Sequence, residues 1–424
     1  MKSKTLKIFI TSIFLFFIII TSFLIYSDTH PPTTTLTIGI YAGSSWDVPD
    51  NEQYHMINYT IHKFQKKHPN IKINYESGIR TSDYINWLSE KIIEGKTPDV
   101  IMMPQSNFNL FASNNTFFDL SSFLNKDNLK HSFYPGTLAS GQYNGKQFTL
   151  PYETNPTLLI ANQTILTKNK IRSLYKINNV EYFRNICHQI SLKKNQYGIT
   201  DSYNWQDAIL ACNVSLFTGN NHELELTNPQ ARHAFNLIED LKSNAPIHNV
   251  TQEMFDQGKV AFIPLPFAQF RTYTTYPYYV TEQTNFEKKA IKMPGQNSTP
   301  ASTVGFGISK NCKNSKLAWE FIRMLCSNRQ VQQELMKTNM GCSVLPKVIK
   351  SSQTKHLLLH SSATRRNIST KQLDLILRDE TIYPKFKNYN QIMYRLDYQI
   401  QKSLNKGNLD SQLFNIQLNI NKNP

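Results

Sequence analysis

The sequence predicts an α/β protein of two lobes, and three observations support this fold class. Segments with the patterns of strands and helices alternate from Thr35 onwards, which is typical of a parallel sheet covered by helices. About 390 residues follow the N-terminal segment, more than the usual length of about 100 to 200 residues for one domain. Hydrophobic residues make up 40% of the chain, as in ordinary globular packing. We therefore expect two packed lobes.

Three strands are expected in the first hundred residues. LTIGIY (residues 36–41) has the β-branched alternation of a core strand, and IKINY (71–75) and VIMM (100–103) follow it. Parallel sheets of this kind bind ligands at the carboxyl ends of their strands. We therefore expect ligand contacts in the loops at residues 42–50 and 104–108.

Two amphipathic helices connect these strands. Residues 54–68 place Ile57, Ile61 and Phe64 on one helical face, and the following proline ends the helix. Ser82 or Asp83 caps the second helix.

The middle of the chain contains a strand with an unusual pattern. A tight hairpin through Asn144-Gly145 leads into LPYETNPTLLIAN (residues 150–162), which is apolar but interrupted by Pro151 and Pro156. Such an arrangement is expected where a strand leaves one sheet to enter another. The rest is mostly helical, with expected helices at 180–189, 205–216, 229–241, 251–257, 315–325 and 389–404, and strands at 258–263 and 305–309.

The N-terminal segment predicts export. Three lysines within the first seven residues precede Ile8 to Tyr26, where only Thr and Ser interrupt the apolar residues. A cleaved signal has an apolar core of about 7 to 15 residues and a spanning helix about 17 to 25, so the length favours an uncleaved membrane anchor over a cleaved signal peptide. We expect residues 1–26 to form this signal or anchor, a transmembrane helix if uncleaved, and residues 27–34 a stalk. The remainder would lie at the outer face of the plasma membrane, anchored or secreted.

Charge and cysteine content argue against two classes of function. The net charge of +16 and pI of about 9.4 suggest an anionic partner, but basic residues come at most two in a row and form no patch with interleaved aromatics. We expect no nucleic-acid partner. The five cysteines are odd in number and lack C-x-x-C spacing, which argues against a disulfide framework or a zinc site. No metal or cofactor is expected.

Five stretches, taken together and in order, resemble the extracellular solute-binding proteins of ABC importers, specifically the carbohydrate-type family 1. They are LTIGIY followed by Trp46, TPDVIMM (97–103), YNGKQFTLPYETNPTLLIAN (143–162), GKVAFIPLPFAQFRTY (258–273) and GFGISKNCKNSKLAWEFIRML (305–325). The resemblance covers roughly residues 35 to 350. It implies a two-lobed periplasmic-binding-protein-like fold with a ligand cleft and a hinge between the lobes. It also implies capture of a solute, a sugar or oligosaccharide by its chemistry, and delivery to ABC permease subunits.

The resemblance divides the chain between the lobes. The N-lobe would combine residues 35–150 with 291–310, and the C-lobe 151–290 with 311–424. The expected crossings between the lobes are residues 150–159, 289–294 and 311–317.

Family ligand sites lie in the cleft, which implies ten ligand-binding residues here: Trp46, Asp47, Gln105, Ser106, Tyr152, Glu153, Asn155, Trp205, Phe267 and Arg271. Their amides and carboxylates could bind sugar hydroxyls, and their aromatic rings could stack on a sugar face. Structural alternatives stay open. Glu153 would then support the hinge backbone, Trp205 would belong to the core, and Arg271 would form a salt bridge.

The sequence favours binding without chemistry, so we expect no enzyme. An exported glycan-acting enzyme needs two carboxylates that flank one bond, and Glu153 has no partner that the sequence identifies. His356 and His360 have i, i+4 spacing, but the residues between them are leucines, so the H-E-x-x-H pattern is absent. A tethered solute sensor that presents its ligand to a membrane receptor remains the alternative binding function.

Overall fold

The structure is a computed structural model that describes residues 21, 34–42, 51–219, 222–243, 249–272, 286–295, 299–338, 340–360 and 367–422. The expected signal or anchor at residues 1–26 lies outside the described residues apart from Thr21, and so does the stalk apart from Thr34. Within the described ranges no helix has the length and apolar character needed to cross a membrane.

A single mixed sheet runs through the molecule. Its strands, in spatial order, are β2 (Ile71–Tyr75), β1 (Thr34–Gly39), β3 (Val100–Pro104), β12 (Ala301–Ile308), β6 (Thr149–Asn162), β10 (Val260–Pro266) and β7 (Tyr197–Ile199), with β11 (Lys288–Ile291) and β13 (Cys342–Ser343) also paired to β6. Two small hairpins, β4–β5 (Gln142–Tyr143, Lys146–Gln147) and β8–β9 (Phe217–Thr218, Glu223–Leu224), lie apart from it.

The three N-terminal strands pair as predicted. β1 lies between β2 and β3 and is parallel to both, with Leu36 opposite Ile73 and Ile38 opposite Val100. Leu36, Ile38 and Ile73 are buried, whereas the threonines that alternate with the apolar residues of β1 are exposed, which accounts for the alternation in its sequence. The sheet as a whole is mixed because β12 runs antiparallel to both β3 and β6.

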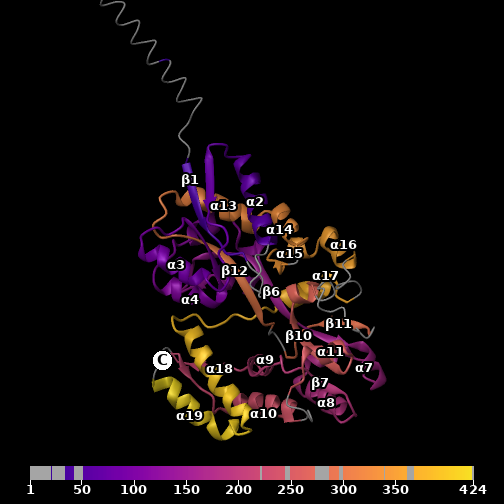
Figure 1. The fold of residues 1–424 in the computed structure, drawn as a ribbon. Helices are drawn as coiled ribbons and strands as arrows, with labels where there is room; N and C mark the ends of the chain where they lie inside the picture. Colours follow the sequence, from indigo (N-terminus) through magenta and orange to yellow (C-terminus); the bar gives the residue numbers. More distant parts are fainter. Residues whose placement is uncertain are drawn as a thin grey trace, which may run out of the picture.

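Strand β6 passes from one half of the sheet to the other, as its two prolines predict. Its first part pairs with β12, and its second part, from Thr157, pairs with β10. Pro151 lies opposite Gly305, where the register shifts, and Pro156 lies at the change of partner. Figure 1 shows β6 running from the upper group of elements to the lower group.

Buried side chains form two core clusters. The first cluster joins β1, β3 and one face of β10 to the helices α2 (Asn51–Gln65), α3 (Tyr84–Ile93), α4 (Gln105–Ser113), α5 (Ser121–Lys126), α6 (Pro135–Ser140), α11 (Gln252–Asp256), α12 (Phe267–Thr272), α13 (Ser315–Ser327), α14 (Arg329–Leu335), α15 (Pro346–Ile349), α16 (Ser352–His360) and α17 (Thr370–Arg378). A short 3-10 helix, η1 (Lys130–Ser132), lies between α5 and α6.

The second cluster is built on the other end of β6. It contains side chains from α7 (Gln163–Lys168), the 3-10 helix η2 (Leu174–Asn178), α8 (Val180–Ser191), α9 (Trp205–Ala211), α10 (Pro229–Ser243), α18 (Tyr389–Asn405) and α19 (Leu409–Lys422). The expected C-lobe included all of residues 311–424. In the structure the helices between 315 and 378 contribute to the first cluster, and only α18 and α19 of that range contribute to the second.

The chain passes to the second cluster for the last time at residues 379–388, between α17 and α18 (Figure 1). This segment is held to β12 and its approach, because Thr299 forms an isolated bridge with Glu380 and Lys292 pairs with Asp379 at 2.7 Å. A crossing was expected at 311–317 instead. Leu317 of that range packs against the first cluster.

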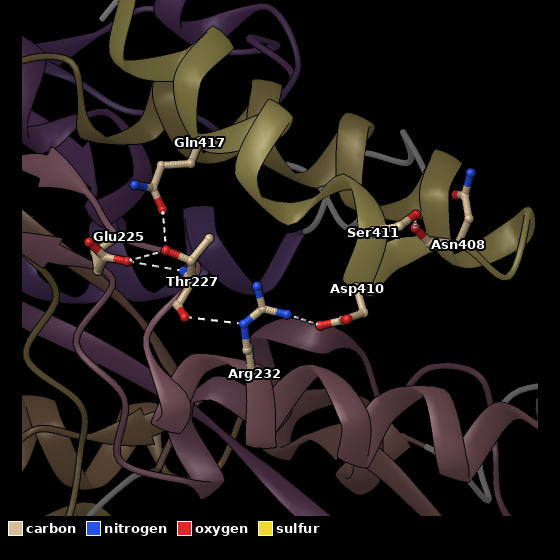
Figure 2. Close-up of polar contacts among 7 residues, drawn as sticks. All are labelled: Glu225, Thr227, Arg232, Asn408, Asp410, Ser411 and Gln417. Carbon is tan, nitrogen blue, oxygen red and sulfur yellow. Dashed lines mark hydrogen bonds and ion pairs between the residues drawn. The ribbon is translucent and has the colours of Figure 1, made fainter.

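The C-terminal helix α19 is an integral part of the second cluster. Gln417 accepts a hydrogen bond from the Leu226 backbone N–H at 2.7 Å, and Asp410 forms an ion pair with Arg232 of α10. Figure 2 shows these side chains reaching from α19 towards the segment around Thr227. Residues up to Lys422 therefore help to fix the fold on this side.

Candidate functional site

A cavity of about 450 Å³ opens where strands β7 and β10 end. We call it the strand-end cavity. Its lining residues are Thr157, Thr200, Asp201, Ser202, Asn204, Asp207, Asn249, Val250, Thr251, Gln252, Ile263, Pro264, Leu265, Pro266 and Gln269. Hydroxyl, amide and carboxylate groups predominate, above a floor formed by the end of β10.

The sheet topology explains why these residues converge. β7 and β10 are parallel, with Tyr197 opposite Val260, so their carboxyl ends lie at the same edge. Thr157 joins them from β6, where it lies opposite Pro266. In open α/β sheets the carboxyl edge of the strands is where ligands bind, because loops and helix starts present polar groups there.

The start of helix α9 fixes one wall of the cavity. Asn204 accepts hydrogen bonds from the N–H groups of Gln206 at 2.8 Å and Asp207 at 3.1 Å, and Asp207 Oδ2 accepts one from the Asn204 N–H at 3.0 Å. This capping box satisfies backbone donors that a helix start would otherwise leave unpaired. It also holds the Asp207 carboxylate at the cavity wall.

A second carboxylate links two loops of the cavity. Asp201 Oδ2 accepts a hydrogen bond from the Val250 N–H at 3.1 Å, and the Asp201 N–H donates to the Val250 carbonyl at 2.9 Å. Burial raises the pKa of Asp207 to about 7. Burial also raises the pKa of Asp201, although the Val250 hydrogen bond and the Lys242 charge oppose this shift.

The crossing strand β6 presents a polar face beside this cavity. Glu153, Asn155 and Thr157 are half-buried, whereas the residues between them are buried, as expected for the two-residue period of a strand. Glu153 Oε1 accepts a hydrogen bond from the Gly341 N–H at 2.6 Å. Asn155 Oδ1 accepts one from the Ala268 N–H at 3.0 Å, in the first turn of α12. Both sequence-predicted residues therefore share a face with Thr157 of the cavity and hold neighbouring segments to the crossing.

Four other predicted site residues make structural contacts. Trp205 is fully buried and donates its indole N–H to Asp397 at 2.7 Å. Tyr152 and Phe267 are fully buried as well. Arg271 donates to backbone carbonyls, at 2.7 Å to that of Met336, and burial lowers its pKa. None of these four lines the strand-end cavity.

The remaining predictions fall near β3 or outside the described residues. Gln105 accepts a hydrogen bond from the Thr303 N–H at 2.9 Å, beside the crossing. Ser106 is exposed, and its carbonyl accepts a hydrogen bond from Asn390 of α18. Trp46 and Asp47 lie outside the described residues.

None of the eight predicted site residues that the structure describes lines the strand-end cavity. Thr200, Asp201 and Ser202 directly follow β7, so the strand-end rule would have identified them had the short strand YGI been recognised. For Asn249 and Gln252 the sequence offers no comparable signal.

The arrangement suits recognition of hydroxyl groups. Among the residues that the structure describes, no three His, Cys, Asp or Glu side chains are grouped as a metal site. The cavity offers acceptors on its carboxylates and amides, and donors on its amides and hydroxyls.

Solved structures of similar fold come from several bacteria. The ABC substrate-binding protein from Listeria monocytogenes in complex with cycloalternan is 17% identical, and the match covers 92% of this chain and 98% of that chain with a TM-score of 0.70. The cyclic α-maltosyl-1,6-maltose binding protein from Arthrobacter globiformis (16% identity, coverage 92% and 98%) gives 0.74. The sugar-binding protein from the phytopathogen Xanthomonas citri (15% identity, coverage 92% and 97%) gives 0.75.

These likenesses confirm the predicted two-lobed periplasmic-binding-protein-like fold. Residues 60–357 match the family of bacterial extracellular solute-binding proteins, and the chain belongs to this family. The resemblance seen in the sequence is thus confirmed. A comparison with curated protein sequences gives no match.

Proposed function

We propose that this protein captures a sugar or oligosaccharide outside the cytoplasm and delivers it to the permease of an ABC transporter. The observation that carries the proposal is the strand-end cavity, whose polar lining lies at the carboxyl edge of β7 and β10. The named ligands and sugar-binding roles of the three similar structures support a carbohydrate.

The chemistry of the lining fits a polyhydroxylated solute. Asn249, Gln252 and Gln269 offer both donors and acceptors, and Ile263 and Leu265 give an apolar surface for the less polar face of a sugar. A volume of about 450 Å³ lies within the usual range for small-molecule sites.

The proposal is one of binding without catalysis, with two lobes that close around the solute. The two core clusters support a division into two lobes joined by β6, the approach to β12 and residues 379–388. We also propose that residues 8–26 tether the protein at the outer face of the membrane, where it would meet its permease; the length of this apolar segment supports the tether.

A thermal-shift screen of the purified protein against carbohydrates, amino acids and peptides tests the function. A ligand that binds only the folded state raises the melting temperature, so we expect a shift with a carbohydrate. A shift with a peptide or an amino acid and with no carbohydrate would contradict the sugar assignment. Release of product in the same wells would show an enzyme instead.

A matched pair of variants tests the location of the site. Gln269→Ala removes an exposed amide from the cavity, and Gln163→Ala removes a half-buried amide from α7, away from the cavity. Loss of one ligand hydrogen bond should weaken binding about two- to tenfold in Q269A. Equal binding by Q269A, Q163A and the unchanged protein would place the ligand elsewhere.

A further inference from the structure

The charged side chains of the strand-end cavity are both acidic. Asp201 and Asp207 line it, and no lysine, arginine or histidine is found among its described lining residues. Lys242 lies close enough to oppose the burial effect on the Asp201 pKa but does not line the cavity.

Backbone hydrogen bonds hold both carboxylates in place and use one oxygen of each. Oδ2 of Asp207 accepts from the Asn204 N–H, and Oδ2 of Asp201 accepts from the Val250 N–H. Within the described part of the chain, no protein donor bonds to Oδ1 of either residue. A solute that enters the cavity therefore meets two fixed acceptor groups.

The local charge is opposite in sign to the charge of the whole protein. The chain carries a net charge of +16, and its cations are scattered along the sequence. At physiological salt, exposed charges are screened over about 8 Å, whereas charges in a partly buried cavity are screened less. At pH 8, above the pKa of about 7 that burial gives Asp207, that carboxylate is ionised, and the described lining then offers a bound solute acidic side chains and no cation.

From this geometry we infer that the strand-end cavity takes an uncharged or amine-bearing glycosyl unit and rejects uronates and sugar phosphates, with Asp201 and Asp207 as the specificity-determining residues. This inference rests on the proposed function. Hydroxyls and amines donate hydrogen bonds to carboxylates, and those bonds are stronger than bonds between neutral groups. A carboxylate or phosphate on the solute would lie unpaired beside two like charges, an arrangement that excludes wrong ligands in many binding sites.

Isothermal titration calorimetry of the full chain at pH 8, where Asp207 is ionised, tests the selection. The probes are the neutral sugar with the largest thermal shift in the screen above and two derivatives of the same linkage, one oxidised to a C6 uronate and one with a C2 amine. We expect the uronate to bind at least about 100-fold more weakly than the neutral sugar, and the amine at least as tightly.

The double variant D201N/D207N removes both charges and keeps an amide oxygen to accept each backbone hydrogen bond. It should reduce the discrimination against the uronate to less than about tenfold. The control E76Q removes an exposed carboxylate that follows β2 and pairs with Lys91 of α3, and it should leave the discrimination unchanged. A thermal melt of each variant checks that it folds.

Two results would overturn the inference while the proposed function stands: equal affinity for the uronate and the neutral sugar, or the same discrimination in D201N/D207N as in the unchanged protein. If no sugar of any charge binds, the proposed function fails, and the inference fails with it.

Discussion

Asp207 belongs to the capping box of α9 and lines the cavity. Its burial predicts that the free energy of unfolding depends on pH. Burial raises its pKa from an ordinary value of 3.8 to about 7. Between about pH 4 and pH 7 the folded state therefore binds more protons than the unfolded state, so the free energy of unfolding falls as pH rises. Asn cannot ionise and can still accept the Asn204 hydrogen bond. At pH 8, D207N should be more stable than the unchanged protein by about 1–2 kcal/mol, after allowance for partial exposure.

Urea unfolding at pH 5 and pH 8 measures this difference. Burial also raises the pKa of Asp256 to about 7, so Asp256 contributes to the pH dependence of the unchanged protein as well. D207N keeps the Asp256 contribution, and the difference between the two proteins therefore reports on Asp207. If the stability of both proteins changes in parallel with pH, the pKa of Asp207 is not raised.

Glu153 should matter for stability as well as for any ligand contact. Its side chain accepts a 2.6 Å hydrogen bond from the Gly341 N–H, close to the short strand β13. Glu153→Ala would leave that donor without this partner and should lower the free energy of unfolding by about 1–3 kcal/mol, measured by urea titration. Glu153→Gln keeps an acceptor oxygen and should lose less than half as much. Full stability in E153A would show that the contact contributes nothing.

At the residue scale, the sequence predicted the polar face of β6 but not the role of each aromatic residue. Glu153 and Asn155 lie beside the cavity because the two-residue period of a strand is regular. Trp205 and Asn204 are adjacent in the sequence, yet one is buried against Asp397 and the other lines the cavity. Their directions depend on how α9 is rotated against the second cluster, and only contacts between distant segments set that rotation.

At the scale of elements, the segment 379–388 depends on a buried carboxylate. Glu380 accepts hydrogen bonds from the hydroxyls of Thr137 in α6 and Thr303 in β12, the latter at 2.7 Å. Thr303→Val keeps the shape of the side chain and removes its hydroxyl, and we expect the free energy of unfolding to fall by about 1–3 kcal/mol. The measurement is chemical denaturation at pH 7.

The neighbouring Ser302 supplies the matched control. It is exposed on the opposite face of β12, so Ser302→Ala should change stability by less than about 0.5 kcal/mol. Equal effects of the two substitutions would mean that the Glu380 contacts do not hold the segment.

The elements differ in how far their sequences determine them. β3 was predictable because its side chains are buried on both faces and read as an apolar run, and β1 because buried Leu36 and Ile38 alternate with exposed threonines. β7 has three residues, too few for a periodic pattern, and it was missed. The crossing at 379–388 was also missed, because residues on α6, β6 and β12 far away in the sequence hold it in place.

At the scale of the whole molecule, the order of motifs indicated the family and the two-lobed fold, whereas the division of the last quarter needed the structure. Helices α13 to α17 and helices α18 and α19 show similar amphipathic patterns, yet they contribute to different clusters. An amphipathic face predicts that a helix is buried and does not specify its partner. One example is α19, which packs on α10 through the ion pair between Asp410 and Arg232; its amphipathic pattern does not specify that partner.

Two lobes joined by three segments should close when solute binds between them, and this predicts linked changes in shape and stability. The strand-end cavity is lined by Val250, Ile263 and Leu265 of the first cluster and by residues at the start of α9, a helix of the second cluster, so a solute seated there lies where the two clusters meet. At a ligand concentration of 100 times the dissociation constant, mass action should add about 2.7 kcal/mol to the free energy of unfolding. Closure should at the same time reduce the radius of gyration measured by small-angle X-ray scattering. D201N/D207N should need a higher concentration of a neutral sugar to reach the same two changes, because its amides replace charged acceptors. A rise in stability with no change in radius would show that the solute binds to one lobe and that the lobes do not close around it.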